Sequence, residues 1–245
     1  AAVESVAWHD VENGSYGQDL TLWRELSAGA GGPILEAGCG TGRVALDLAA
    51  HGHHVLGVDI EPVLVAAFCE RAETRGLETS AQVGDIRNLE VAGEFALILV
   101  PMQMIQLLEG ADERRAALES MRGVLSPRGR IAIAIVEGDL DANAPGSELS
   151  RPLPDVKEIG DCVYSSLPIE LRVDAGRIVI SRLRQIVAPD GDLTEERHDL
   201  SLAVLDAASF ETEADLAGLT PAGRQEISST EAHVGSCVVL FEAAS

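Results

Sequence analysis

Three glycines on alternate positions, with an acid after the next apolar run, are the first residues in this chain that could do chemistry. Gly38, Gly40 and Gly42 follow one apolar run, and Asp59 ends the next. Glycine lets a backbone turn sharply and lets a ligand approach main-chain atoms that a Cβ would shield. A carboxylate beside such a turn can accept hydrogen bonds from ligand hydroxyls. The spacing therefore predicts a site for a nucleotide-like ligand.

The elements that must position these residues are a strand, a helix and a second strand. Residues 34–35 form a short apolar run bounded by a turn, as a buried parallel strand requires. Residues 44–49 carry apolar side chains at helical spacing, and Gly52 marks the end of that helix. Residues 55–58 predict the next strand, which places Asp59 at its carboxyl end, where a doubly wound sheet binds ligands.

The glycine spacing argues against two common nucleotide sites. The dinucleotide fingerprint has a third glycine or alanine where this chain has Arg43, which disfavours a nicotinamide-dependent oxidoreductase. A Walker A loop is excluded because no Gly-Lys-Ser/Thr sequence follows.

A second acid follows another short apolar run. Residues 81–83 predict a strand, and Asp85 comes directly after it within a Gly-Asp-Ile tripeptide. An aspartate in this position can bind a ligand or cap a helix. Residues 95–100 form a longer apolar run, which predicts the central strand of the sheet.

Taken together, these motifs resemble those of the class I methyltransferases that use S-adenosylmethionine. They are Glu36-x-Gly38-x-Gly40-x-Gly42, the acid Asp59 and the tripeptide Gly84-Asp85-Ile86. The resemblance covers residues 33–136 and 206–242. It implies an α/β protein with a doubly wound, mostly parallel seven-stranded sheet, the Rossmann-like methyltransferase fold, in which the last strand is antiparallel.

The resemblance also implies how the chain would hold this cofactor. Glu36 and the glycine turn would hold the methionine part, and Asp59 would accept hydrogen bonds from both ribose hydroxyls. Asp85 would accept a hydrogen bond from the adenine amino group, with Ile86 beside the ring. The full set of predicted cofactor contacts is Tyr16, Glu36, Ala37, Gly38, Gly40, Arg43, Asp59, Ile60, Asp85, Ile86, Val100 and Pro101.

In this family the residues after the central strand face the methyl donor, so Met102, Gln103 and Gln106 are the predicted substrate contacts. Methionine is an adaptable liner for an apolar substrate, and glutamine can orient a polar group without carrying charge. The segment is neither acidic nor an Asn-Pro-Pro-Tyr sequence, which argues against methylation of DNA adenine or of glutamine.

The candidate general bases are His9, Glu137 and His198, and the sequence does not rank them. A bound neutral amine needs no strong base, whereas a hydroxyl nucleophile is helped by roughly 10²–10⁴-fold. The expected reaction is in-line transfer of a methyl group to an O or N atom of a small molecule. The alternative is a non-catalytic protein that binds or senses S-adenosylmethionine and lacks an open substrate cavity beside Met102.

Charge and composition narrow the choice of partners. The formal net charge of −22 over 245 residues opposes binding to nucleic acid and to anionic membranes, so a small-molecule acceptor is expected. The four cysteines show no C-x-x-C pair, and the histidines within 51–54 lie between a helix end and a strand, so no metal site is predicted. No apolar run is long enough to span a membrane and no signal peptide is visible, which favours a cytoplasmic protein.

The chain divides into three predicted regions. Residues 1–32 predict an N-terminal helical lid, with its helix at 18–26, although Trp23 and Leu26 could equally dock this helix on the sheet. Residues 33–137 and 206–245 predict the cofactor-binding domain. Residues 138–205 predict an inserted antiparallel β meander, which could cap the substrate pocket or pair two subunits into a homodimer.

Further elements follow from turn residues and periodicity. In the insert, a mobile loop is expected at 138–154 and strands at 162–173, 177–188 and 193–204. In the main domain, helices are expected at 61–75, 111–125 and 206–219, a fifth strand at 131–136 after a turn at 128–130, and a final hairpin at 220–227 and 234–241. The positive charge concentrates in the insert, on Arg172, Arg177, Arg182, Arg184 and Arg197. These arginines should balance the acidic chain, which is the favoured interpretation, or one of them could bind an anionic group of the substrate.

Overall fold

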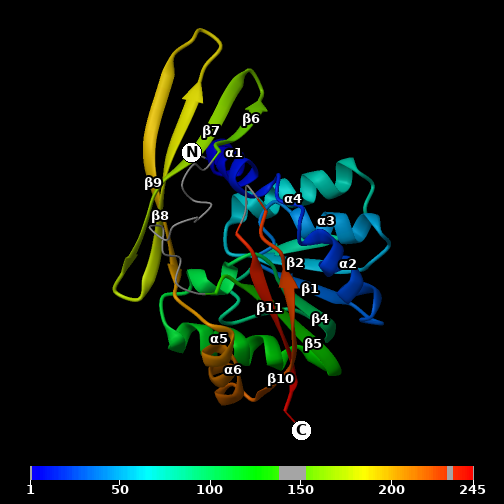
Figure 1. Cartoon of the computed structure of the whole chain (residues 1–245). Helices are drawn as coiled ribbons and strands as arrows, with labels where there is room; N and C mark the ends of the chain where they lie inside the picture. The colour runs from blue at the N-terminus through cyan, green and yellow to red at the C-terminus, as the bar shows by residue number, and fades with distance from the viewer. Residues whose placement is uncertain (1, 138–152, 231–233, 245) are drawn as a thin grey trace.

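Two β-sheets organise the protein (Figure 1), whose computed structural model describes residues 2–137, 153–230 and 234–244. Among these residues, seven strands form a mixed sheet in the order β10-β11-β5-β4-β1-β2-β3. The strands are β1 (Ile34–Ala37), β2 (Val55–Asp59), β3 (Ser80–Val83), β4 (Phe95–Val100), β5 (Leu125–Ile135), β10 (Leu219–Ile227) and β11 (Ser236–Ala243).

The direction of these strands confirms the predicted fold class. Strands β1 to β5 pair in parallel, β11 pairs antiparallel with β5, and β10 pairs antiparallel with β11. Strand β1 has β2 on one side and β4 on the other, so the strand order reverses beside it. In open α/β sheets this switch point is where ligands bind, outside the carboxyl ends of the strands.

Helices cover both faces of the large sheet. The described helices are α1 (Ala2–Asn13), α2 (Leu20–Ala28), α3 (Arg43–Ala50), α4 (Pro62–Thr74), α5 (Ala111–Gly123), α6 (Ala207–Leu216) and the 3₁₀ helix η1 (Met104–Leu107). Helices α5 and α6 bury their apolar side chains on one face, and α2, α3 and α4 bury theirs on the other. None of these helices is both long enough and apolar enough to cross a membrane.

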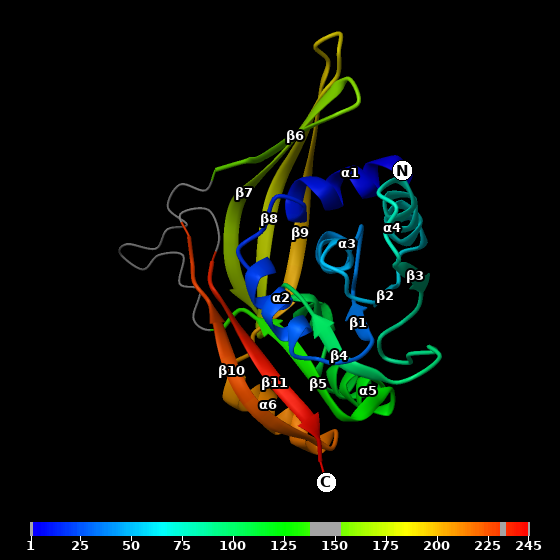
Figure 2. The ribbon, with the colours of Figure 1, turned by 90° about the vertical axis from the view of Figure 1, so that its right-hand side faces the viewer.

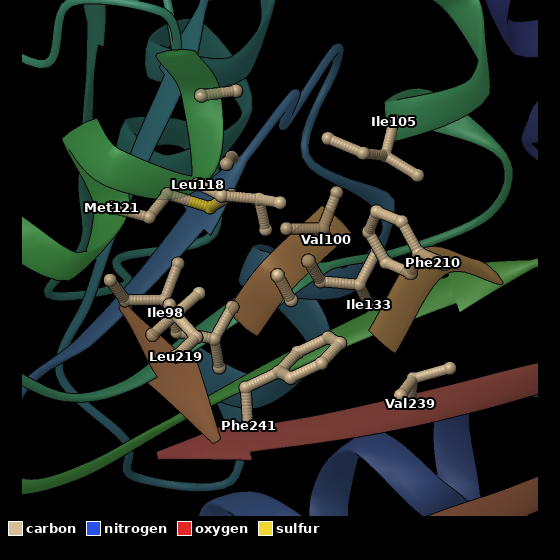
Figure 3. Packing of buried hydrophobic residues seen from close by; sticks show 14 of the residues in the cluster. Ile98, Val100, Ile105, Leu118, Met121, Ile133, Phe210, Leu219, Val239 and Phe241 are labelled. Atoms are coloured by element: carbon tan, nitrogen blue, oxygen red, sulfur yellow. The ribbon is translucent and has the colours of Figure 1, made fainter. Parts of the chain in front are cut away.

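The core under α5 and α6 shows why the central strands read as apolar runs (Figure 3). Ile98 and Val100 of β4 and Ile133 of β5 are fully buried, because a parallel strand covered on both faces has no exposed side. Phe210 of α6 meets Phe241 of β11 edge to face, with ring centroids 5.7 Å apart. This packing fixes the central strands, and with them the chain segments that leave their carboxyl ends.

The second sheet is antiparallel and corresponds to the predicted insert. Its described strands lie in the order β6-β7-β8-β9: β6 (Asp155–Ile159), β7 (Cys162–Asp174), β8 (Arg177–Val187) and β9 (Leu193–Ala203). The three predicted strands are present, and β6 is an additional edge strand. Most of the loop expected at 138–154 lies outside the described residues.

The arginines of the insert pair mainly with acids, as the charge argument predicts. Arg172 pairs with Asp199, and Arg182 pairs with Asp155. Arg197 contacts both Asp199 and Glu170.

Strand β5 corrects the expected turn at 128–130. The strand already begins at Leu125, opposite Phe95, and the register shifts between Phe95 and Leu97. A Cβ at Gly129 would lie 2.7 Å from the carbonyl oxygen of Phe95, so the glycine lets the two strands approach closely at this irregularity. The residues that suggest a turn are thus part of a strand with a local bulge.

The N-terminal region contains helix α1 (Ala2–Asn13) in addition to the helix expected at 18–26. Helix α1 lies between the four-stranded sheet and helix α4 (Figure 2). Trp8 and Val11 pack against Tyr164 of β7, with the Trp8 and Tyr164 ring centroids 5.1 Å apart. Because α1 is buried on more than one side, its sequence lacks the single apolar stripe that identifies a surface helix.

Candidate functional site

The glycine turn lies at the carboxyl end of β1, at the switch point of the large sheet. Gly38, Gly40 and Gly42 have φ angles of +75°, +52° and +92°, in the left-handed region that glycine adopts without strain. The amides of Gly38 and Cys39 donate to the carbonyl of Val58, at 2.8 and 3.1 Å. The turn is therefore held against β2 by its own backbone.

Asp59, at the end of β2, holds the same turn from the side. Its Oδ2 accepts a hydrogen bond from the Gly40 amide at 2.8 Å, and its Oδ1 accepts one from the Glu61 amide at 2.9 Å. A carboxylate has about four lone-pair sites, so acceptor capacity remains for ligand hydroxyls. Its predicted role toward ribose stays a prediction that this geometry allows.

Glu36 faces the interior rather than the solvent. It is 3% exposed, and its Oε2 accepts a hydrogen bond from the Ala45 amide at 2.7 Å, which ties β1 to the first turn of α3. Burial raises the pKa of this carboxyl to about 8, although Arg43 and the Ala45 amide act in the opposite direction. The hydrogen bond fixes where α3 starts, and the predicted contact of Glu36 with the donor is not tested.

Arg43 connects the glycine turn to the N-terminal segment. Its guanidinium pairs with both carboxylate oxygens of Asp19 at 2.6 and 2.7 Å, and donates to the Tyr16 carbonyl at 2.8 Å. The same group lies 5.2 Å from the centre of the Tyr16 ring. Asp19 also accepts a hydrogen bond from the Trp23 indole at 2.8 Å. The two predicted cofactor contacts, Tyr16 and Arg43, thus meet each other, through an aspartate that the sequence did not single out.

The predicted adenine contacts lie at the ends of β2 and β3. Asp85 is paired with Arg87 at 2.6 Å, and hydrogen bonds from Arg87 hold the pKa of Asp85 below its usual range. Arg87 also pairs with Glu113 at 2.6 Å. Ile86 is buried, whereas Ile60 is 57% exposed beside Asp59. An exposed isoleucine next to this acid leaves an apolar surface on which a ring could lie.

The end of β4 lies beside the glycine turn. Ala37, Val100 and Pro101 are buried there, so a ligand would meet their backbone rather than their side chains. A Cβ at Gly38 would lie 2.5 Å from Cγ of Met104, a contact that the sequence did not assign. Met102 has a φ of +54°, a conformation that is strained for a residue with a side chain. Such strain often lies at functional sites.

Of the predicted substrate contacts, Met102 and Gln103 are partly exposed and Gln106 is fully buried. The Gln106 amide nitrogen donates to the carbonyls of Val136 and Ala203, at 3.1 and 2.8 Å, and its oxygen accepts from the Val136 amide at 2.8 Å. Both N–H donors and one acceptor site of the amide are thus used inside the protein. The side chain joins η1, the end of β5 and the end of β9, so its burial does not favour the predicted contact with the substrate, which stays a prediction.

His9 of α1 lies directly on the glycine turn. A Cβ at Gly40 would overlap its imidazole ring, and its Nδ1 lies 3.3 Å from the Thr41 hydroxyl. Burial lowers the pKa of His9, although Asp59 and Asp10 act in the opposite direction. An imidazole that stays neutral near pH 7 can accept a proton.

Asp10 holds α1 in this place. Its carboxylate accepts a hydrogen bond from the Thr41 hydroxyl at 2.9 Å, and Arg71 of α4 pairs with it at 2.6 and 2.9 Å. The sequence did not predict these contacts of Asp10 with Thr41 and Arg71, since each partner belongs to a different element. The available signal was the adjacent pair of polar residues, His9 and Asp10.

The candidate bases separate into two groups. His9 and His198 line one cleft of about 640 Å³ between α1, the start of α4 and the inner face of the four-stranded sheet. Glu137 instead accepts a hydrogen bond from the Ala207 amide at 2.5 Å, at the first turn of α6. The structure thus brings the two histidines together and leaves Glu137 outside their cleft.

In the described part of the chain, no group of three or more metal-binding side chains is arranged to hold a metal ion.

Comparison with known proteins agrees with this geometry. Residues 34–129 match the model of a methyltransferase domain family. Over 131 residues the chain is 32% identical to the O-methyltransferase resE of Aspergillus sclerotiorum, covering 50% of this chain and 46% of that protein. Over 150 residues it is 34% identical to the S-adenosyl-L-methionine-dependent Diels-Alderase iccD of Talaromyces variabilis, covering 58% and 46%. The chain therefore spans about half the length of these curated relatives.

A solved structure matches nearly the whole chain. The sugar N-methyltransferase KedS8 from a Streptoalloteichus species superposes with a TM-score of 0.75 at 14% identity, covering 99% of this chain and 93% of that one. At this identity the likeness concerns the fold, and it confirms the architecture predicted from the glycine turn and the two acids.

Proposed function

We propose that this chain, whose residues 34–129 match the model of a methyltransferase domain family, transfers a methyl group from S-adenosylmethionine to a nitrogen or oxygen atom of a small molecule. One observation carries the proposal most directly. A left-handed glycine turn and a carboxylate with spare acceptor capacity meet at the switch point of the sheet. Side chains at these glycine positions would collide with Met104, His9 and Phe68, so the close packing of the turn requires glycine.

The same residues indicate how the donor would be held. The turn at Gly38 and Gly40 would approach its methionine part, and Asp59 would accept from its ribose hydroxyls. Ile60 and Ile86 would flank its adenine, with Asp85 beside them.

For methyl transfer, the main task of the protein is to position the two reactants. When bound, S-adenosylmethionine supplies a methyl group already activated by its sulfonium. The chain must hold the acceptor atom in line with that methyl group, and such positioning can contribute about 7–11 kcal/mol. The ends of β1 and β4 suit this task, because these two strands are largely buried.

The net charge supports a small-molecule acceptor rather than a nucleic acid. At −22 the chain would repel a phosphate backbone, and most of its arginines named above already face acids.

Calorimetric titration with S-adenosylmethionine, S-adenosylhomocysteine and NADH tests the proposal. We expect binding of the two sulfur ligands and none of NADH. Asp59→Ala should weaken donor binding by about 100-fold, because two hydrogen bonds to a charged group are lost. Asp47→Ala, which removes an acid paired with Arg24 on α2, is the matched control and should keep full affinity. Full affinity in the Asp59 variant would refute the site.

A second candidate function follows from the relative iccD. Its printed name describes a Diels-Alderase that depends on S-adenosyl-L-methionine, and a Diels–Alder reaction joins a diene to a dienophile without moving a methyl group. A protein that only binds or senses the cofactor would likewise bind S-adenosylmethionine without transferring its methyl group. Incubation with S-adenosylmethionine labelled in the methyl group separates them, since only a methyltransferase moves the label and releases S-adenosylhomocysteine.

A further inference from the structure

We propose that the methyl acceptor is an amine that carries a positive charge in solution, that it binds in the cleft between α1 and the four-stranded sheet, and that His9 removes its proton. This inference rests on the proposed methyl transfer. The cleft, of about 640 Å³, has the size of small-molecule sites, which are typically about 300–1,000 Å³.

The position of the cleft makes it the natural approach to the donor site. His9 lines the cleft and at the same time covers Gly40. Glu61 also lines it, and the Glu61 amide donates to Asp59. Two residues of the cleft wall are thus in direct contact with the residues predicted to hold the donor.

Charge on the cleft walls decides the class of acceptor. Glu61 and Glu196 face the cleft, and so does Glu12, which already holds Arg184 at 2.7 and 2.8 Å. Arg184, which lines the same cleft, also lies 5.0 Å from the centre of the Trp8 ring. Arg184 also pairs with Glu196 at 3.5 Å, so Glu12 and Glu196 share this one cation. Together with Glu61, these carboxylates outnumber the cation and give the cleft a negative field. Such a field concentrates cations and repels anionic acceptors.

A cationic amine has no free electron pair, so it must lose a proton before it can attack. The imidazole of His9 is placed to take that proton, since it lies between the cleft and the glycine turn. The charged groups around it are Asp59 of β2, its neighbour Asp10, Arg71 of α4 and Arg43 of α3. Their charges largely oppose one another, and burial keeps the imidazole neutral.

The step balances as follows. The ammonium group gives one N–H proton to His9, which becomes an imidazolium. The freed electron pair of the nitrogen forms a bond to the methyl carbon, the methyl–sulfur bond breaks, and its electron pair stays on sulfur. The products are an N-methylammonium ion, S-adenosylhomocysteine and a protonated His9, which returns its proton to water.

The first experiment measures transfer of labelled methyl groups to matched pairs of acceptors that differ only in an amine or a hydroxyl. Suitable pairs are glucosamine with glucose, and 2-phenylethylamine with 2-phenylethanol. We expect transfer to amines at least about tenfold above transfer to the matched hydroxyls. Transfer to hydroxyls alone would overturn this inference and leave the proposed function standing. Donor binding without transfer to either arm would overturn both.

Charge in the cleft is tested with neighbouring residues of one strand. Glu196→Gln should raise KM for the amine about fivefold, the change expected for a partly exposed ion pair, without changing donor affinity. Glu195→Gln is the control. Glu195 lies next to Glu196 on β9, on the opposite face, and accepts a hydrogen bond from Gln185. Equal effects of the two variants would contradict a cation site on the inner face.

The role of His9 is tested by its dependence on pH. His9→Gln should lower kcat on the order of 10²-fold near pH 7. The loss should shrink as the pH rises toward the pKa of the amine, because the acceptor then loses its proton to water. A purely structural role would give a loss independent of pH, which would overturn the assignment. His198→Gln, on the opposite wall, serves as the comparison.

Discussion

Gly40 is the residue at which the glycine turn and helix α1 meet most closely. Its φ of +52° is costly for a residue with a Cβ, and a Cβ there would overlap the His9 ring. Any side chain at this position must therefore displace α1 as well as strain the turn. The residue fixes how tightly the N-terminal helix can close over the site.

We predict that Gly40→Ala lowers the free energy of unfolding by about 2–4 kcal/mol, with backbone strain and the displaced His9 ring both contributing, and weakens donor binding. Gly52→Ala is the matched control, because Gly52 also has a positive φ of +84° but has no atom near its missing Cβ. It should lose only the strain contribution, about 1–2 kcal/mol, and keep donor affinity. Urea unfolding and calorimetry measure the two quantities. The contact with α1 is unimportant if the two variants behave alike.

Glu36 gives a prediction about pH. Its pKa is raised from an ordinary value of 4.5 to about 8, so the folded protein keeps this proton over a range in which the unfolded chain has lost it. Its contribution to the free energy of unfolding therefore falls as the pH rises from about 5 to about 8, by at most about 1.4 kcal/mol per pH unit.

Glu36→Gln should remove this decline. The glutamine amide oxygen can still accept from the Ala45 amide, and it carries no charge at any pH. We expect the variant to gain stability relative to the wild type between pH 5 and pH 8, as measured by urea unfolding at both values. A constant difference between the two proteins would show that the carboxyl does not titrate in this range.

At the scale of elements, α1 joins the two sheets. Glu12 accepts a hydrogen bond from Ser166 at 2.7 Å and pairs with Arg184, while Asp10 holds the other side of the helix to Thr41 and Arg71. Each of these contacts connects residues far apart in the chain. The helix therefore owes its place to tertiary contacts more than to its own sequence.

We predict that Glu12→Gln frees α1 from the four-stranded sheet. The substitution leaves Arg184 without its main partner in a largely buried place, which typically costs about 3–5 kcal/mol. Limited proteolysis should cut the N-terminal segment faster than in the wild type. Glu211→Gln breaks the more exposed pair with Arg224 and should cost at most about 1 kcal/mol. Resistance to proteolysis in the Glu12 variant would contradict the proposed joint.

The sequence predicts the elements whose signal is local. Strand β4 is a continuous apolar run, β1 begins with one, and the glycine turn that follows β1 has a recognisable spacing. Strand β6 is missed because it is a short edge strand with exposed charges, such as Lys157, and looks like a loop. The start of β5 is missed because Pro127 and Gly129 suggest a turn, whereas pairing with β4 decides the conformation.

The site divides in the same way. The glycines, Asp59 and the two histidines could be found because their types and positions carry the chemistry. The burial of Gln106 and the partners of Arg43 could not, since both depend on segments that only the folded chain brings together. From the sequence alone, a polar residue such as Gln106, which follows a central strand, could either contact a ligand or be buried in the protein.

At the scale of the whole molecule, the dominant property is the charge of −22. S-adenosylmethionine carries one net positive charge at neutral pH, whereas S-adenosylhomocysteine carries none. The field of the protein should therefore speed the arrival of the first ligand and not the second.

We predict that the association rate constant of S-adenosylmethionine falls several-fold between about 20 mM and about 300 mM salt, because the Debye length shortens from roughly 20 Å to roughly 6 Å. S-adenosylhomocysteine is the control, and its rate should hardly change. Stopped-flow measurement of binding gives both rates. Equal salt dependence for the two ligands would mean that the overall charge does not guide the donor.

The two ends of the inserted region lie side by side. Glu137 forms a parallel bridge with Leu205, and the Gln106 amide bonds to Val136 just before the insert and to Ala203 near its end. The chain thus leaves the large sheet and returns to it at neighbouring positions, so the insert is attached to the sheet at one place. Lengthening, shortening or exchanging the inserted region leaves the order of the seven strands unchanged. Changes to the insert can therefore accumulate without altering the sheet that carries the glycine turn and Asp59.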